Sequence, residues 1–97
     1  MKNDKRRKRG NMKRNIAHWK IALDNGVKKM RLDVQFKDFN EAFGFIGRVA
    51  LISESLGHHA EIINCYNKVT LKLHTHDKNK ITDLDKKMAK LIYKILT

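Results

Sequence analysis

The sequence of 97 residues lacks several features of secreted and membrane proteins. Its one cysteine, Cys65, excludes an internal disulfide, so a reducing compartment is the simplest expectation. No apolar run approaches the roughly twenty residues that a membrane-spanning helix needs, and the first residues lack the apolar segment of a secretory signal. Their high Arg content fits a transit peptide, but they lack its serines and its amphipathic pattern. We therefore expect a cytoplasmic protein that makes no membrane contact.

Acidic residues are also scarce, since ten Asp and Glu stand against 22 Lys and Arg, for a net charge of +12. Residues 1–14 carry eight basic residues and one acidic residue. A segment with so few apolar side chains cannot offset the entropy lost on ordering, so we predict a disordered basic tail at 1–14 and one folded domain at 15–97. The tail is either a solvated arm or a contact for nucleic acid, a transcription factor or nuclear import.

Apolar spacing predicts the elements of the first half of the domain. A short helix is predicted over residues 15–25 from the spacing of Ile16, Trp19, Ala22 and Leu23. Alternation of apolar and polar residues predicts a strand over 29–36 with one face in solvent. Apolar positions three and four apart predict the main core helix over 40–56, capped by Asp38 and closed by Gly57. We assign its phenylalanines to core and interface packing, namely Phe39, Phe43 and Phe45.

The second half of the domain predicts two strands and a helix. Alternation over 59–66 and 69–74 indicates antiparallel strands joined by a turn near Asn67. Thr82 is the predicted N-cap of a last helix, whose buried stripe is Leu84, Met88, Leu91, Ile92 and Ile95. This order predicts an α+β domain with an antiparallel sheet of four-stranded type, of which about three strands are evident, and helices packed on one face. So small a sheet leaves an edge strand free to pair with another subunit.

Four of the five histidines lie between residues 58 and 76. Imidazole titrates near neutral pH and is the usual general acid or base, although the clustering alone also fits a polar helix end. Glu54 precedes His58 by four residues, so we expect its carboxylate to orient that ring. His74 and His76 are two apart and would face the same way on a strand, which offers a zinc or copper alternative. Nothing else has a tight ligand spacing, so we predict no metal site.

Several spaced motifs resemble the pterin-4a-carbinolamine dehydratase family: Phe36-Lys-Asp-Phe-Asn-Glu-Ala-Phe-Gly-Phe45, Arg48-Val-Ala-Leu51, Glu54, His58-His59, Tyr66-Asn67-Lys68-Val69, Thr75-His76 and Asp85. The resemblance covers about residues 19–97. It implies dehydration of 4a-hydroxytetrahydropterin, the product left by aromatic amino acid hydroxylases, to quinonoid dihydropterin and water, as in tetrahydrobiopterin recycling. It also implies a homotetramer that needs no metal or organic cofactor.

The resemblance also implies which residues form the site. The catalytic residues it implies are His58, His59 and His76, with Glu54 and Asp85 as nearby acids. The substrate contacts it implies are His58, His59, Ala60, Thr75, His76, Asp77 and Lys78. His74 matches no catalytic position, and we expect His18 to be structural or exposed. The sequence does not assign acid and base, but we expect His58 and His76 to act on protons while His59 positions the pterin.

Two departures from the family pattern affect the site. Ala60 stands where the family usually has a proline, which leaves His59 less constrained. Asn79 or Lys80 must form a turn for which the family commonly uses glycine.

The alternative function is a non-catalytic transcriptional coactivator or scaffold that binds a partner helix, since some relatives bind a transcription factor. The retained histidines and acids favour the enzyme, while the natural pterin is left open.

Overall fold

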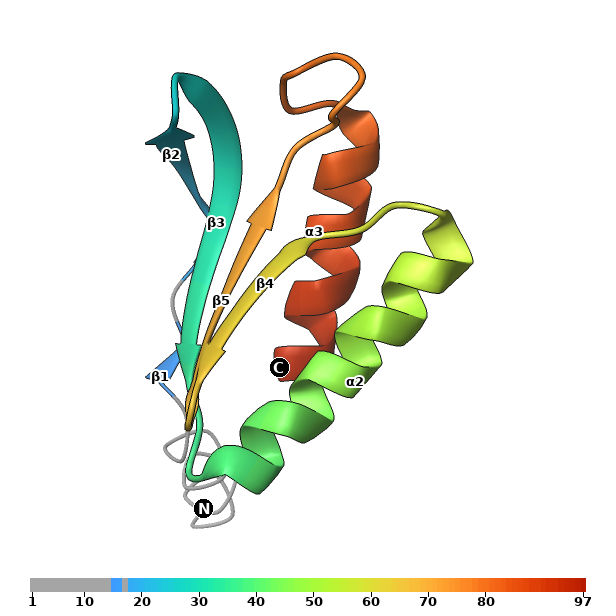
Figure 1. The fold of residues 1–97 in the computed structure, drawn as a ribbon. Coiled ribbons are helices and arrows are strands. Elements are labelled where there is room, and N and C mark those ends of the chain that lie inside the picture. The colour runs from blue at the N-terminus through green and yellow to red at the C-terminus, as the bar shows by residue number, and fades with distance from the viewer. Residues whose placement is uncertain (1–14, 17) are drawn as a thin grey trace, which may run out of the picture.

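The computed structural model describes residues 15–16 and 18–97, so the predicted tail at 1–14 lies outside the described residues. The elements follow in the order β1 (Asn15–Ile16), β2 (Lys20–Asp24), β3 (Val27–Gln35), α2 (Phe39–Leu56), β4 (Glu61–Cys65), β5 (Lys68–Leu73) and α3 (Asp83–Leu96). Figure 1 shows α2 and α3 on one face of the sheet. This arrangement confirms the predicted α+β class. Neither described helix is long and apolar enough to cross a membrane.

All strand pairs in the sheet are antiparallel. β3 and β5 form its centre, β4 pairs with β5 at one edge, and both β1 and β2 pair with β3 at the other. β1 lies beside the end of β3, at Val34 and Gln35, whereas β2 lies beside its first half, from Val27 to Arg31. The two short strands therefore share one edge position, and the sheet is four strands wide.

The predicted helix over residues 15–25 is wrong, because the described residues in this range form β1 and β2. Asn25 and Gly26 have φ angles of 53° and 80°, and Asp24 pairs with Val27 across them. Two successive residues with positive φ are what a two-residue hairpin turn requires, and Asn-Gly is the sequence that best supplies them. The helical spacing of the apolar residues does not decide the structure here, because pairing with β3 supplies the backbone hydrogen bonds of β2.

The predicted ends of the helices are confirmed. Asp38 caps α2 by accepting a hydrogen bond from the Glu41 N–H at 2.9 Å, and Gly57 ends the helix in the left-handed conformation with φ 62°. Thr82 is the N-cap of α3, whose third residue, Asp85, accepts a hydrogen bond from the Thr82 N–H at 2.9 Å. Both caps fix where the chain leaves one element for the next, and both ends carry residues of the candidate site.

The hydrophobic core lies between the sheet and the two helices. Its buried side chains are Leu32, Val34, Phe36, Ala42, Phe45, Val49, Val69, Leu71, Leu73, Met88, Ala89, Ile92 and Leu96. The predicted stripe of α3 is only partly right, because Leu84 and Leu91 are both 36% exposed. Instead the buried face of α3 consists of Asp85, Met88, Ala89, Ile92 and Leu96. The helix is turned so that a carboxylate points inward, which hydropathy patterning does not anticipate.

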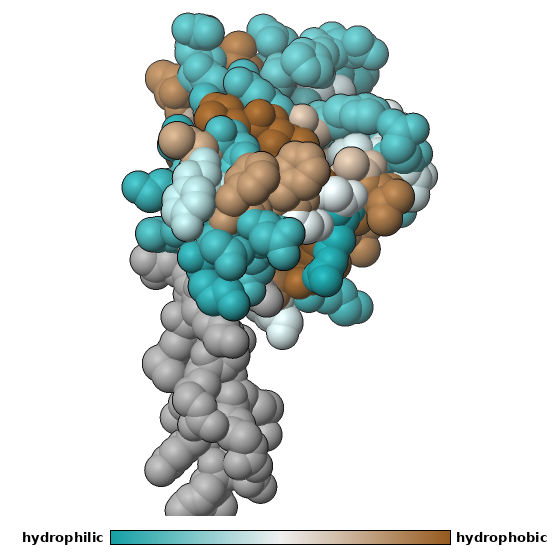
Figure 2. Space-filling view, turned by 60° about the horizontal axis from the view of Figure 1, so that its bottom comes forward, coloured by the Kyte–Doolittle hydropathy of each residue, from teal (hydrophilic) through white to brown (hydrophobic). Residues whose placement is uncertain are grey.

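The three phenylalanines of α2 have different environments. Phe45 is buried and contacts Phe36, so its predicted core role is confirmed. Phe39 and Phe43 are 45% and 58% exposed, with ring centroids 5.5 Å apart. Figure 2 shows hydrophobic side chains gathered among polar ones on the face of the molecule that it views. Interface packing for the two exposed rings stays a prediction.

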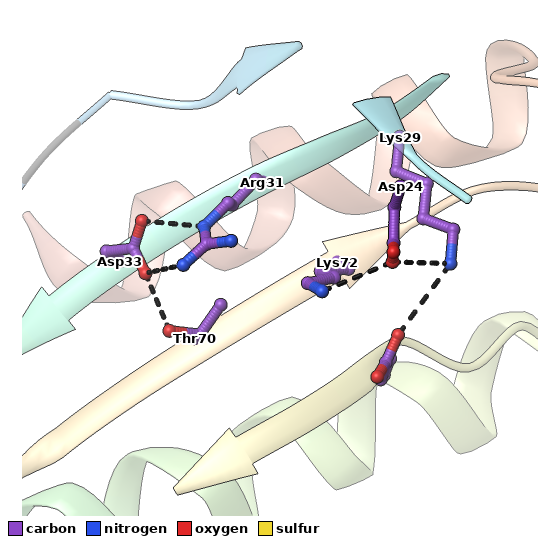
Figure 3. Close-up of polar contacts among 7 residues, drawn as sticks. Asp24, Lys29, Arg31, Asp33, Thr70 and Lys72 are labelled. Atoms are coloured by element: carbon purple, nitrogen blue, oxygen red, sulfur yellow. Dashed lines mark hydrogen bonds and ion pairs between the residues drawn. The ribbon is translucent and has the colours of Figure 1, made fainter. Parts of the chain in front are cut away.

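The other face of the sheet is polar, as the alternation in β3 predicted. In Figure 3 charged and hydroxyl side chains cross β2, β3 and β5 on the side away from the helices. Arg31 pairs with Asp33 at 3.0 Å, and Asp33 also accepts a hydrogen bond from Thr70 at 2.6 Å. Asp24 accepts hydrogen bonds from Lys29 at 3.0 Å and Lys72 at 3.2 Å. These two groups of contacts tie β2, β3 and β5 together without apolar packing.

Candidate functional site

The least exposed histidine of the site is His58, which follows the glycine that ends α2. Its backbone N–H donates to the Ser53 carbonyl at 3.1 Å, so the turn of the chain fixes the direction of the ring. Its Nε2 lies 2.5 Å from Oδ1 of Asp85, and the two side chains are 11% and 0% exposed. A carboxylate can only accept hydrogen bonds. Nε2 of His58 therefore carries the proton in this contact, and in the neutral form of the ring Nδ1 carries the lone pair.

Asp85 is held as an ionised acceptor by several donors. Its Oδ2 accepts hydrogen bonds from the Thr75 hydroxyl at 2.8 Å and from the Thr82 N–H at 2.9 Å. Burial opposes ionisation, but the hydrogen bonds from His58, the Thr82 backbone and Thr75 outweigh it and lower the pKa of Asp85. The result is a buried carboxylate that fixes the tautomer of His58.

Thr75 and Thr82 support this carboxylate together. Their hydroxyl oxygens lie 2.7 Å apart. Because the Thr75 hydroxyl gives its proton to Asp85, Thr82 is the donor between the two threonines. The sequence predicted Thr82 only as a helix cap and Thr75 as a substrate contact. The capping pattern of Thr82 and Asp85, three residues apart, was the available signal that this carboxylate is fixed in place.

Glu54 contacts a different histidine from the one expected. Its Oε2 lies 3.2 Å from Nε2 of His59, whereas the partner of His58 is Asp85. The prediction that Glu54 orients His58 is therefore wrong. The reason is that the helix ends at Gly57, so His58 leaves the helical path and the four-residue spacing no longer places it over Glu54. The His59 and Glu54 side chains are 64% and 75% exposed, so their contact is a weak surface pair.

His76 lies in a tight loop between β5 and α3. The loop closes where the Thr75 N–H donates to the Lys80 carbonyl at 2.9 Å and the Asn79 N–H donates to the His76 carbonyl at 3.1 Å. Asn79 has a φ of 54°, so it adopts the conformation that a glycine would otherwise supply. Of the two residues predicted for this turn, Asn79 is the one that forms it.

These segments border an open hollow of about 260 Å³, which we call the histidine cavity. Its lining residues are Gly57, His58, His59, Thr75, His76 and Asp77, and all of them except Gly57 are predicted site residues. Ala60 instead packs against the core, and Lys78 is exposed on the loop. Asp85 and Glu54 do not line the cavity, but they contact His58 and His59, respectively, and both histidines line it. The arrangement offers three imidazoles of differing exposure around one small hollow.

His74 lies next to His76, with ring centroids 4.3 Å apart, so the expectation that the two face the same way is confirmed. Burial, and then the neighbouring charges of His76 and Lys29, lower the pKa of His74, which favours its neutral form. No group of three or more His, Cys, Asp or Glu side chains is placed to hold a metal ion within the part of the chain that the structure describes. The pair thus has no third ligand there.

Comparison with known proteins gives a consistent result. The sequence profile of the family described as Pterin 4 alpha carbinolamine dehydratase matches residues 2–95. A relative from Prochlorococcus marinus (strain NATL2A) is 46% identical over 74 residues, covering 76% of this chain and 76% of the relative. A relative from Synechococcus sp. (strain WH7803) is 40% identical over 77 residues, covering 79% of this chain and 78% of the relative. Both relatives are named for this dehydratase.

Solved structures show the same fold. A crystal structure described as a transcriptional coactivator/pterin dehydratase from Brucella melitensis matches with a TM-score of 0.75 at 34% identity, covering 100% of this chain and 97% of that one. A pterin dehydratase-like protein described as a RuBisCO assembly factor in the alpha-carboxysome matches with a TM-score of 0.65 at 16% identity, covering 78% of this chain and 86% of that one, and shares the fold alone. On the family profile and the relatives together, this chain belongs to the pterin 4 alpha carbinolamine dehydratase family.

Proposed function

We propose that this protein dehydrates 4a-hydroxytetrahydropterin to quinonoid dihydropterin and water by histidine general acid–base catalysis, in tetrahydrobiopterin recycling. Family membership supports pterin carbinolamine dehydration as the general chemistry. The observation that carries the finer proposal is the His58–Asp85 pair, in which a buried carboxylate fixes one histidine at the edge of the cavity that His76 also lines. The pair supplies a base of defined tautomer on the same cavity as a second imidazole, that of His76.

The reaction requires two proton transfers. The departing hydroxyl gains a proton as its bond to carbon breaks, and the adjacent ring nitrogen loses a proton as its double bond to the same carbon forms. We assign the base to Nδ1 of His58, because Nε2 is committed to Asp85. The imidazolium that forms on His58 is stabilised by the Asp85 carboxylate. Positioned acid–base groups of this kind contribute on the order of a hundred to ten thousand fold in rate.

His76 is the acid in this assignment, and His59 positions the pterin. His76 lies in the exposed loop and lines the same cavity as His58, so it can regain its proton from solvent between turnovers. His59 has a largely exposed ring that Glu54 steadies, which suits substrate contact better than proton transfer. The Asp77 carboxylate also lines the cavity and can accept hydrogen bonds from the amino and ring N–H groups of a pterin.

No redox cofactor enters this proposal, because the proton taken from nitrogen and the proton given to oxygen balance and no electrons are transferred. The test is the rate of 4a-hydroxytetrahydropterin dehydration, followed by ultraviolet absorbance with a metal chelator present. The His76→Ala variant is expected to lose about a hundredfold or more in kcat. The matched control is His18→Ala, because His18 is an exposed histidine that does not line the cavity. A wild-type rate no faster than buffer would refute the proposal.

The second candidate function is a scaffold or transcriptional coactivator that binds a partner helix. The exposed Phe39 and Phe43 side chains on α2 favour it, because paired exposed aromatics are common at interfaces. The Brucella melitensis structure, whose name includes transcriptional coactivator, gives it further weight. A Phe43→Glu variant that keeps dehydratase activity but loses partner binding would support both functions in one chain.

The same surface supports the homotetramer that we propose. A chain of this size gains stability by burying exposed aromatics against other copies. Sedimentation of the wild type and of Phe43→Glu tests this, and we expect the variant to form smaller assemblies. An unchanged distribution would place the subunit contacts elsewhere, for example at the edge strand β4.

A further inference from the structure

A second hollow, of about 850 Å³, lies along α3 on the side of the first strands. We call it the α3 groove, and its lining residues are His18, Trp19, Met30, Lys86, Ala89, Lys90, Tyr93, Lys94 and Thr97. It shares no lining residue with the histidine cavity. The dehydratase proposal therefore makes no use of this groove, and its residues need another explanation.

The floor of the α3 groove is preformed. The Trp19 indole N–H donates to the Ala89 carbonyl at 3.0 Å, which anchors the ring against α3. The rings of His18 and Tyr93 stack with centroids 5.4 Å apart, and the Tyr93 hydroxyl lies 3.2 Å from Nδ1 of His18. Side chains that are already fixed lose little entropy when a ligand covers them. The floor can therefore accept an apolar partner without rearrangement.

The apolar surface continues from the groove onto β2. Ile21 is the pairing partner of Met30, so their side chains lie on the same face of the sheet. Ile21 is 59% exposed, although its face is the one that the helices cover elsewhere. Figure 1 shows β2 at one edge of the sheet, whereas α2 lies nearer the other edge, where β4 is. A partner that filled the groove would bury Ile21 as well.

One wall of the groove is strongly basic. Lys86, Lys90 and Lys94 recur every four residues of α3 and so form one row along the helix. All three are exposed, and no ion pair between described residues involves any of them. The groove thus combines an apolar floor with a row of cations that lack acidic partners in the described part of the chain.

We propose that the α3 groove binds an acidic amphipathic helix of a partner protein, with its apolar face on Trp19, Met30 and Ile21 and its carboxylates against the lysine row. Carboxylates four residues apart on such a helix match the spacing of the lysines. Residues 1–14 of this chain are a poor occupant, because eight basic residues would face the lysines with only one acid. A nucleic acid would neutralise the lysines but leave the aliphatic Met30 and Ile21 side chains uncovered.

The test is a binding titration of the full-length protein with a synthetic peptide helix that has leucines on one face and glutamates on its flanks. Trp19 is the only tryptophan of the chain, so its fluorescence reports occupancy of the groove directly. Anisotropy of the labelled peptide gives the Kd at low and high salt. We expect saturable binding that shifts the Trp19 emission and weakens with salt.

Two substitutions with matched controls distinguish binding in the α3 groove from non-specific electrostatic attraction to the basic protein. Lys90→Glu is expected to weaken binding by about fivefold or more, while Lys37→Glu, the same change at an exposed lysine outside the groove, leaves it unchanged. Ile21→Thr is expected to weaken binding by about tenfold, while Ile63→Thr, at the opposite edge of the sheet, leaves it unchanged. A peptide with one glutamate replaced by lysine should bind Lys90→Glu more tightly than it binds the wild type, because only the contact at residue 90 is reversed.

Three results would overturn the proposal. Equal binding by Lys90→Glu and Lys37→Glu, with no change in Trp19 emission, would place the peptide elsewhere on this basic protein. A single-stranded oligonucleotide that binds more tightly than the peptide, and loses affinity in Lys90→Glu, would identify a nucleic-acid site instead. Equal losses of binding in Ile21→Thr and Ile63→Thr would show that the apolar contact is not specific to the α3 groove. The dehydration rate of Lys90→Glu should equal that of the wild type, because Lys90 does not line the histidine cavity.

Discussion

The Asp85→Asn substitution tests the central pair of the site without changing its shape. Oδ1 of Asp85 accepts from His58 at 2.5 Å, and Oδ2 accepts from Thr75 at 2.8 Å and from the Thr82 N–H at 2.9 Å. Asparagine has only one acceptor oxygen. If that oxygen keeps the two threonine donors, the amide NH₂ points at Nε2 of His58. Nε2 must then accept a hydrogen bond, so the His58 proton moves to Nδ1.

The cost has two parts. Loss of one charge-assisted hydrogen bond costs about 1.5–3 kcal/mol of folding stability. The change of tautomer removes the lone pair that we assign as the base, and so forfeits the acid–base contribution of about a hundred to ten thousand fold in kcat. The stability loss is modest because the amide oxygen still caps α3 through the Thr82 N–H.

The assay is the rate of 4a-hydroxytetrahydropterin dehydration, with ¹⁵N NMR of the imidazoles to identify the His58 tautomer and urea unfolding to measure stability. Asp83→Asn is the matched control, since Asp83 lies two residues earlier in the first turn of α3 and is exposed. We expect it to keep the wild-type rate. An Asp85→Asn protein with wild-type kcat, or with His58 still protonated on Nε2, would refute the reasoning.

Three further predictions concern the rest of the domain. Glu54→Gln should change kcat by less than about twofold, because its pair with His59 is exposed, and a hundredfold loss in the dehydration assay would contradict this. Ile92→Ala should lower the free energy of unfolding by about 2–5 kcal/mol in urea titrations, because Ile92 is 0% exposed; a change below about 1 kcal/mol would be inconsistent with that core. The hydrogen bond from Arg31 lowers the pKa of Asp33 below 3.8, so its contribution to stability is present above that pH and lost as pH falls through the lower folded pKa. Thermal melting temperatures measured at decreasing pH should therefore fall, and less steeply in Asp33→Asn; equal slopes would argue against the linkage.

Local signals in the sequence predicted most of the fold. Asp38, Gly57 and Thr82 mark helix ends through their own backbone and side-chain chemistry, and each is found where that chemistry predicts. The alternation of β3 and β5 also survives, because one face of the sheet is buried and the other carries the polar network. Such signals depend on neighbours in the sequence, so they can be interpreted without knowledge of the fold.

The errors arose where long-range contacts decide the outcome. Residues 20–24 have apolar positions that fit a helix, yet pairing with β3 makes them a strand, and the Asn25-Gly26 turn was the signal that should have prevailed. The side of α3 that faces inward depends on Asp85, which a hydropathy pattern assigns to solvent. Its burial is explained by its hydrogen bonds, which come from Thr75, from Thr82 and from His58, 27 residues away in the sequence.

The candidate site was predicted as a set of residues but not as a set of contacts. Histidine clustering and the family motifs identified His58, His59 and His76, and all three line one cavity. The pairing of Glu54 with His58 was wrong because the helix end at Gly57, which the sequence does predict, turns the chain between the two residues, and the pairing of His58 with Asp85 is a long-range contact. The roles of Thr75 and Thr82 around Asp85 likewise depend on a loop closure that the sequence does not display.

The most direct test of the account is the dehydration rate of wild type, His58→Ala, His76→Ala and the double variant under one set of conditions. The account predicts a wild-type rate about a hundredfold or more above buffer. It also predicts a double variant no slower than the slower single variant, because the two histidines act in one coupled proton exchange. A wild-type rate equal to buffer, or single variants as fast as wild type, would contradict the claim that His58 and His76 carry the reaction.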